Sequence, residues 1–133
     1  MNGVSWWKGN GDPNDTFGIN NGVLINGAGY ATGKVGQAFD LRGSNDYLQV
    51  ASPVGLPVGA APRTMMLWFK TPNSWADTYP LMMQYGGTAP SSKFGLMAVD
   101  SGGRKLYFWG EANDLVGSTV LQTNTRVPRR SHL

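Results

Sequence analysis

Short alternations of apolar and polar positions run along most of this chain. The clearest ones are residues 37–41 and 47–50, and the Gly, Asn and Asp residues between them are typical of a turn. These two segments predict either a β-hairpin or a strand corner. No window of 11 or more residues carries the apolar period of an amphipathic helix. The pattern therefore predicts an all-β chain.

Further strands are predicted on both sides of this segment. Residues 64–70 have apolar side chains on both faces, which is typical of a central strand. Residues 93–99 and 105–109 flank a Gly- and Ser-containing turn and predict a hairpin. Shorter or weaker strands are predicted at residues 4–7, 23–25, 81–85 and 115–121, and residues 30–32 lead into the 37–50 segment. The proline-rich residues 51–63 predict a connector, because proline cannot donate to a sheet.

Four motifs in order resemble one known superfamily. An aromatic pair at Trp6-Trp7 precedes a Gly-, Asn- and Asp-rich loop at residues 9–22, the run GKVGQAFDLRGSNDYLQV at residues 33–50, and TMMLWFK at residues 64–70. This order is similar to the laminin-G-like branch of the concanavalin A-like lectins and glucanases, over about residues 4–122. The resemblance implies an antiparallel β-sandwich of the jelly-roll type. The later strands of that family have no counterpart here, so an incomplete sandwich is expected.

Charge separates the body of the chain from its last residues. Residues 1–125 hold eight Lys or Arg and eight Asp or Glu, so the net charge of +3 comes from Arg126, Arg129 and Arg130. We therefore expect one domain over residues 1–125 and a basic tail over residues 126–133. A balanced body argues against nucleic-acid binding. One DNA encoding of residues 127–133, read one base later, spells SHVAVTY, the strand the family would show next. The tail is thus hypothesised to be an out-of-frame ending.

Composition limits the compartment and the membrane relationship. The chain has no cysteine, so a disulfide scaffold is excluded and the redox compartment is undetermined. It has no apolar run of 18 residues, which argues against membrane insertion. No signal peptide is recognised at its start. The resemblance implies an extracellular or cell-surface protein.

Two groups of residues are candidate binding sites. Trp75 and Tyr79 lie in a predicted loop and could stack on the C–H face of a sugar, with Asp46 as a polar partner; packing and turn capping are the alternatives. The loop that follows the first strand is a candidate Ca²⁺ site, because hard cations bind several oxygen ligands. Its candidate ligands are Asp12, Asn14, Asp15 and Asn20. The alternative is that these residues only form turns.

Catalysis has little support in the sequence. A glycosidase needs two carboxylates across the scissile bond, and Glu111 is the only glutamate. The only histidine is His132, in the tail, and no nucleophile triad or phosphate-binding motif occurs. The chain is therefore expected to be a non-catalytic recognition module for carbohydrate or a glycosylated surface. The alternative is a structural module that completes its sandwich by forming a homo-oligomer, because open strands and uncovered apolar surface favour association.

Overall fold

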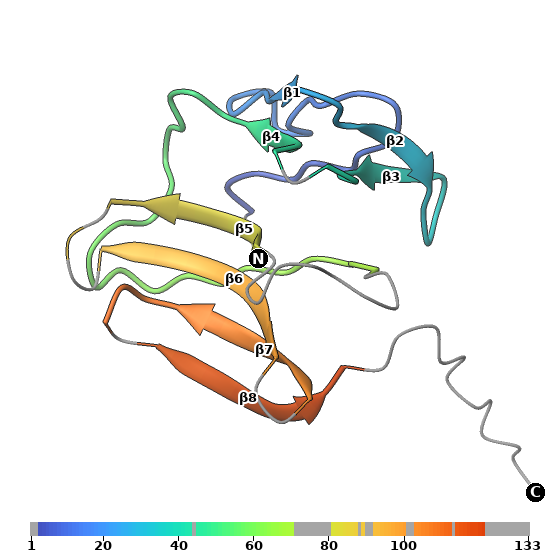
Figure 1. Cartoon of the computed structure of the whole chain (residues 1–133). Coiled ribbons are helices and arrows are strands. Elements are labelled where there is room, and N and C mark those ends of the chain that lie inside the picture. The colour runs from blue at the N-terminus through green and yellow to red at the C-terminus, as the bar shows by residue number, and fades with distance from the viewer. Residues whose placement is uncertain are drawn as a thin grey trace, which may run out of the picture. The chain divides into compact units, whose positions relative to one another are not determined.

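The protein is all-β. The computed structural model describes residues 3–43, 45–70, 81–87, 89, 92–100, 103–112 and 114–121. These residues form eight strands and no helix, and all the strand pairs are antiparallel (Figure 1). The all-β class predicted from the alternation is confirmed.

The chain divides into two compact units, Met1–Pro57 and Val58–Leu133. We call them unit 1 and unit 2 and describe each by itself. The boundary falls within the proline- and glycine-rich connector that the sequence predicts. A single domain over residues 1–125 stays a prediction, and the tail at residues 126–133 lies outside the described residues.

Unit 1 contains two separate two-stranded ladders. Its strands are β1 (Val23–Ile25), β2 (Gly29–Thr32), β3 (Gln37–Asp40) and β4 (Tyr47–Gln49). Strand β1 pairs with β4, and β2 pairs with β3 (Figure 1). The two clearest alternating segments, now β3 and β4, therefore do not pair with each other. They form a strand corner, which was one of the two predicted alternatives.

Unit 2 is a four-stranded meander. Its strands are β5 (Leu81–Gly86), β6 (Lys93–Asp100), β7 (Arg104–Trp109) and β8 (Leu115–Val120). They hydrogen-bond in the order β5-β6-β7-β8, so each strand pairs with the next one along the chain (Figure 1). The predicted hairpin is confirmed as β6 and β7, and the weaker predicted strand at residues 115–121 is confirmed as β8.

The apolar core of the described residues lies on β6. Met97, Ala98 and Val99 are its buried apolar side chains. Strand β6 is paired on both sides, by β5 and by β7, so its backbone groups are satisfied while side chains on both of its faces are covered. This strand is the centre on which unit 2 is built.

The strand predicted at residues 64–70 is wrong. These residues form no strand, although their side chains alternate between half-buried and exposed as far as Trp68. Trp68 is 86% exposed and Met66 is 79% exposed, so one of the two apolar faces is uncovered. A strand needs a hydrogen-bonded neighbour, and no described strand pairs with this segment. Apolar residues on both faces therefore did not indicate a central position here.

The strand predicted at residues 4–7 is reduced to a single bridge. Trp7 pairs with Asp15 in an isolated antiparallel bridge, and the Thr16 N–H donates to the Trp6 carbonyl at 2.8 Å. The segment is held mainly by side-chain hydrogen bonds from the loop that follows it. Those bonds involve residues predicted as calcium ligands.

Candidate functional site

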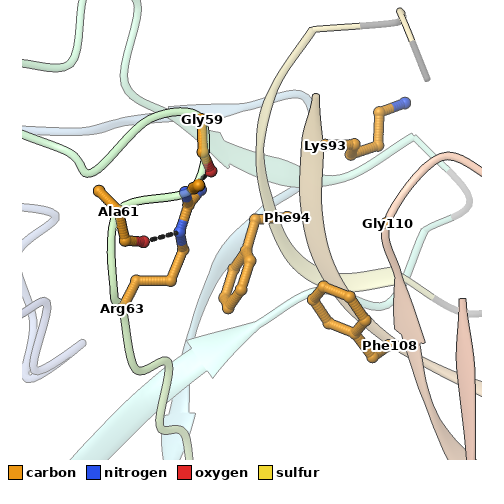
Figure 2. A pocket seen from close by; sticks show the side chains of 8 residues that line it. Gly59, Ala61, Arg63, Lys93, Phe94, Phe108 and Gly110 are labelled. Atoms are coloured by element: carbon orange, nitrogen blue, oxygen red, sulfur yellow. Dashed lines mark hydrogen bonds between the residues drawn. The ribbon is translucent and has the colours of Figure 1, made fainter. Parts of the chain in front are cut away.

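A hollow of about 250 Å³ opens on unit 2, beside the β6–β7 hairpin. It is lined by small residues of the connector, by one aromatic ring on each of two neighbouring strands, and by two cationic side chains (Figure 2). The lining residues are Gly59, Ala60, Ala61, Arg63, Lys93, Phe94, Phe108 and Gly110. An aromatic surface beside a hydrogen-bond donor is an arrangement that can bind a small ligand.

The register of the meander brings the aromatic rings together. Tyr85 on β5 lies directly opposite Phe94 on β6, with ring centroids 5.7 Å apart. Phe108 on β7 lies opposite Leu96, which makes it a diagonal neighbour of Phe94 on the same face of the sheet. The Phe94 and Phe108 rings meet edge to face, with their centroids 4.9 Å apart. The three rings form a continuous apolar surface.

Arg63 lies over this aromatic surface. Its guanidinium carbon is 5.1 Å from the centre of the Phe94 ring and 5.9 Å from that of Tyr85, which are cation–π distances. Figure 2 shows its side chain beside the Phe94 ring, with Phe108 beyond. The connector therefore supplies a cation to a face that the strands make apolar.

Neutral oxygens hold the guanidinium in place. Its Nε donates to the Ala61 carbonyl at 3.1 Å, and one terminal nitrogen donates to the Gly59 carbonyl. The other terminal nitrogen donates to the Tyr85 hydroxyl at 3.3 Å. These contacts orient the side chain without neutralising its charge.

The second cation of the hollow is already paired. The Lys93 ammonium lies 3.1 Å from the Glu111 carboxylate and 3.6 Å from the centre of the Trp109 ring. In Figure 2 the Lys93 amine points away from Arg63. The charge of Lys93 is therefore balanced inside unit 2.

The polar loop of unit 1 is organised by one carboxylate. Asp15 is 3% exposed. Its Oδ1 accepts from the backbone N–H of Trp6 at 2.8 Å and of Phe17 at 3.1 Å. Its Oδ2 accepts from the N–H of Asn20 at 3.1 Å. The carboxylate thus ties the first aromatic segment to the loop.

These donors also set the acidity of the group. Burial alone would raise the pKa of Asp15, because it disfavours the charged form. The N–H groups of Trp6, Phe17 and Asn20 and the Ser5 hydroxyl outweigh burial, so the pKa lies below its ordinary value. Asp15 is therefore held as a carboxylate at neutral pH.

Asn20 extends the same network. It is 1% exposed, and its side-chain oxygen accepts from the Val54 N–H at 2.7 Å. Its amide nitrogen donates to the Ser5 hydroxyl at 2.6 Å and to the Val54 carbonyl at 3.0 Å. The backbone oxygen of Asn20 accepts from the Trp7 indole at 2.7 Å. Residues far apart in unit 1 meet at this amide.

The predicted calcium ligands do not form an open set of oxygens. The oxygens of Asp15 and Asn20 already accept hydrogen bonds, and Asp12 accepts from the Asn14 N–H at 2.9 Å in a local turn. Each of these oxygens therefore already serves the loop itself, and a calcium ion would have to use the lone pairs that remain. The alternative of turn formation accounts for the contacts. Calcium binding at this loop stays a prediction.

Asp46 clamps the strand corner. Its two carboxylate oxygens accept from the N–H of Gly27 at 2.9 Å and of Gly43 at 2.7 Å. Gly27 lies between β1 and β2, and Gly43 lies between β3 and β4, so one side chain joins both connections. Capping of the turn through backbone amides, the role that the sequence favoured for Asp46, is confirmed. Its role as a sugar partner stays a prediction, and Trp75 and Tyr79 lie outside the described residues.

The hollow was not predicted from the sequence. The hairpin predicted for residues 93–99 and 105–109 already implies a register that places Phe94 and Phe108 on one face of the sheet. Nothing in the local sequence placed Arg63 over Phe94, because its position depends on the path of an irregular connector. The hollow therefore becomes visible only in three dimensions.

Comparison with protein-family models, with curated proteins and with solved structures finds no match for this chain. In the part of the chain that the structure describes, no helix has the length and apolar character needed to cross a membrane. Among the same residues, no three His, Cys, Asp or Glu side chains gather where a metal ion could be held.

Proposed function

We propose that this protein is a non-catalytic recognition module that binds carbohydrate or a glycosylated surface. The observation that carries the proposal is the hollow in which Arg63 lies over the Phe94 ring, with the Phe108 ring next to it. The motif order described above supports it independently, because the superfamily it resembles includes lectins. A jelly-roll sandwich of that type is part of the same proposal.

The chemistry of the hollow suits a sugar ring. A pyranose has an apolar C–H face, which packs on aromatic rings, and hydroxyls, which accept from N–H groups. Phe94 and Phe108 supply the apolar surface, and Arg63 supplies donors beside it. The volume of about 250 Å³ is below the range of about 300–1,000 Å³ typical of sites for drug-sized ligands. A single sugar residue at a chain end is the ligand of matching size.

The lining supports recognition without catalysis. Glycoside hydrolysis uses a pair of carboxylates on either side of the scissile bond. The described lining residues are Gly, Ala, Phe, Arg and Lys, and the neighbouring Glu111 is engaged by Lys93. These groups bind and orient a ligand, but they do not provide the acid and base of that reaction.

A glycan array probed with the labelled full chain tests the proposal. We expect a defined set of glycans to bind. The Phe108→Ala substitution should weaken that binding by about tenfold, since burial of an aromatic ring against a ligand contributes on the order of 1–2 kcal/mol. Phe17→Ala is the matched control, because Phe17 is an exposed ring in unit 1 and should leave binding unchanged. Absence of glycan binding by the folded wild-type chain would contradict the proposal.

A second candidate function is self-assembly, and an exposed strand edge favours it. Strand β8 is the last strand of the meander and is paired only with β7 among the described strands. Leu115 is 69% exposed, Val116 45% and Val120 43%. The strand, LVGSTV, contains no charge and no proline, which are the usual devices that prevent edge-to-edge pairing. A second copy of the chain could add to this edge.

Light scattering coupled to size-exclusion chromatography tests this candidate. We expect the wild type to form a dimer or larger species, and Val116→Lys to shift it toward monomer, because a charged side chain on an edge disfavours strand addition. Val35→Lys makes the same change at a residue that is 87% exposed and outside the strands, so it should not shift the distribution. A wild type that stays monomeric at high concentration would contradict self-assembly.

A further inference from the structure

The charge of Arg63 is the feature of the hollow that the binding of a neutral sugar leaves unexplained. The ion pairs of the described side chains join Arg42 to Asp40 and Lys93 to Glu111. Arg63 instead contacts carbonyl, hydroxyl and aromatic groups, all of which are neutral. Arg63 is half-buried, and no carboxylate of a described residue pairs with it. Among the described side chains its positive charge is therefore uncompensated.

The guanidinium also keeps hydrogen-bonding capacity. It carries five N–H groups, one on Nε and two on each terminal nitrogen. The three contacts to Ala61, Gly59 and Tyr85 use one N–H on each nitrogen. One N–H on each terminal nitrogen remains, so the guanidinium keeps two donors for an anionic ligand.

The side chain is fixed before a ligand arrives. Two connector carbonyls hold it from one side, and the Phe94 and Tyr85 rings lie against it. A preoriented arginine loses less conformational entropy on binding than a free one, so more of the interaction appears as affinity. The hollow therefore combines an oriented cation with an apolar surface formed by Phe94 and Phe108.

We infer that the hollow binds a sugar residue that carries a carboxylate, such as a hexuronic acid at the end of a glycan. The carboxylate accepts from Arg63, and the C–H face of the same ring packs on Phe94 and Phe108. A single negative charge is the best match, because Lys93 is balanced by Glu111 and Arg63 is the one unbalanced cation among the described lining residues. This inference rests on the proposed recognition of carbohydrate and names its ligand class.

The test compares acidic and neutral forms of the same sugar. Methyl β-glucuronide and methyl β-glucoside, and methyl α-galacturonide and methyl α-galactoside, are titrated into the isotope-labelled full chain and followed by amide chemical shifts. We expect each acid to bind at least about tenfold more tightly than its neutral partner, because hydrogen bonds to charged groups are the strong ones. The shifts are expected at residues 93–96 and 106–110, around the hollow.

Variants assign the effect to Arg63. Arg63→Gln should reduce the affinity for each acid to that for the neutral sugar, and Arg63→Lys should lose most of the preference, because an ammonium lacks the bidentate fork. Arg42→Gln is the matched control, since Arg42 is an exposed arginine of unit 1 and should leave the preference unchanged. The amide spectrum of each variant reports whether it is folded, and the sugar pairs on the wild type decide the inference even if a variant unfolds.

The outcomes separate this inference from the proposed function. Equal binding of acidic and neutral sugars at the hollow would overturn the inference and leave carbohydrate recognition in place. Binding of neither would overturn both. N-acetylglutamate amide carries a carboxylate without a sugar ring; if it binds as tightly as the uronides, the hollow recognises acids rather than sugars, and the inference is also overturned.

Discussion

At the scale of single residues, Asp15 shows how a polar group can take the place of a core residue. Among the described residues of unit 1, the buried positions are Asp15, Asn20 and two glycines rather than apolar side chains. A buried carboxylate is tolerated only when its oxygens accept hydrogen bonds, and three backbone N–H groups meet that need here. The loop is therefore ordered by hydrogen bonds whose strength depends on the charge of one side chain.

This dependence predicts the effect of Asp15→Asn. An asparagine can present only one acceptor oxygen, so at least one N–H group loses its partner, and we expect unit 1 to lose about 1–3 kcal/mol of stability at pH 7. The folded-state pKa of Asp15 lies below its ordinary value of 3.8, so its contribution is present above pH 3.8 and is lost as the pH falls through the folded-state pKa. The variant should lack this acid-induced loss. Urea unfolding between pH 2 and pH 7, followed by the amide signals of Trp6 and Asn20, measures both effects.

Asp12→Asn is the matched control, because Asp12 is exposed and accepts one local hydrogen bond. It should change stability by less than about 0.5 kcal/mol. Equal losses in the two variants would show that Asp15 has no special role.

Adding calcium to the wild type at pH 7 tests the predicted metal site on the same samples, since an ion held by Asp15 would raise the stability of the wild type but not that of Asp15→Asn.

The residue types of this loop were recognisable from the sequence, but their roles were not. Asp and Asn at close spacing indicate both calcium binding and turn formation, because the same oxygens serve either purpose. Which purpose applies depends on whether the N–H groups of residues 6, 17 and 20 point at the carboxylate. The direction of these N–H groups is set by the folded backbone and cannot be predicted from the local sequence.

At the scale of elements, alternation located most strands but not their partners. Residues 81–85, 93–99 and 105–109 were predicted as strands, and all three form within the meander. Residues 64–70 were predicted as a strand from apolar side chains on both faces and form none, because pairing depends on a neighbouring strand that no local pattern encodes. A short turn predicts that the two strands it joins pair with each other. This holds for every connection in unit 2 but not for the turn between β3 and β4 in unit 1.

The corner in unit 1 illustrates the same limit. The polar turn between β3 and β4 is compatible with a hairpin, yet each strand pairs with a partner that precedes both of them in sequence. Asp46 accounts for the outcome, because its two oxygens join the β1–β2 connection to the β3–β4 connection. A hairpin would have satisfied the turn but would not have brought Gly27 to this carboxylate.

At the scale of the whole molecule, the two units are stabilised by different means. Unit 1 combines two-stranded ladders with a polar buried network, and isolated two-stranded ladders are marginal in water. Unit 2 has four strands and an apolar centre at Met97, Ala98 and Val99. The hydrophobic contribution is therefore concentrated in unit 2, on the strand that also carries Phe94 of the hollow.

This contrast predicts the pattern of amide hydrogen exchange in the full chain. The slowest amides should lie at residues 96–99 of β6, because that strand is hydrogen-bonded on both sides and its side chains exclude water. Amides of β1 to β4 should exchange at least about tenfold faster, since opening a two-stranded ladder exposes little apolar surface. Exchange at pH 7 and 25 °C, followed by NMR on the intact protein, gives both sets of rates in one experiment. Equal protection in the two units would mean that they unfold as one cooperative body, and the single domain predicted from the sequence would then be the better description.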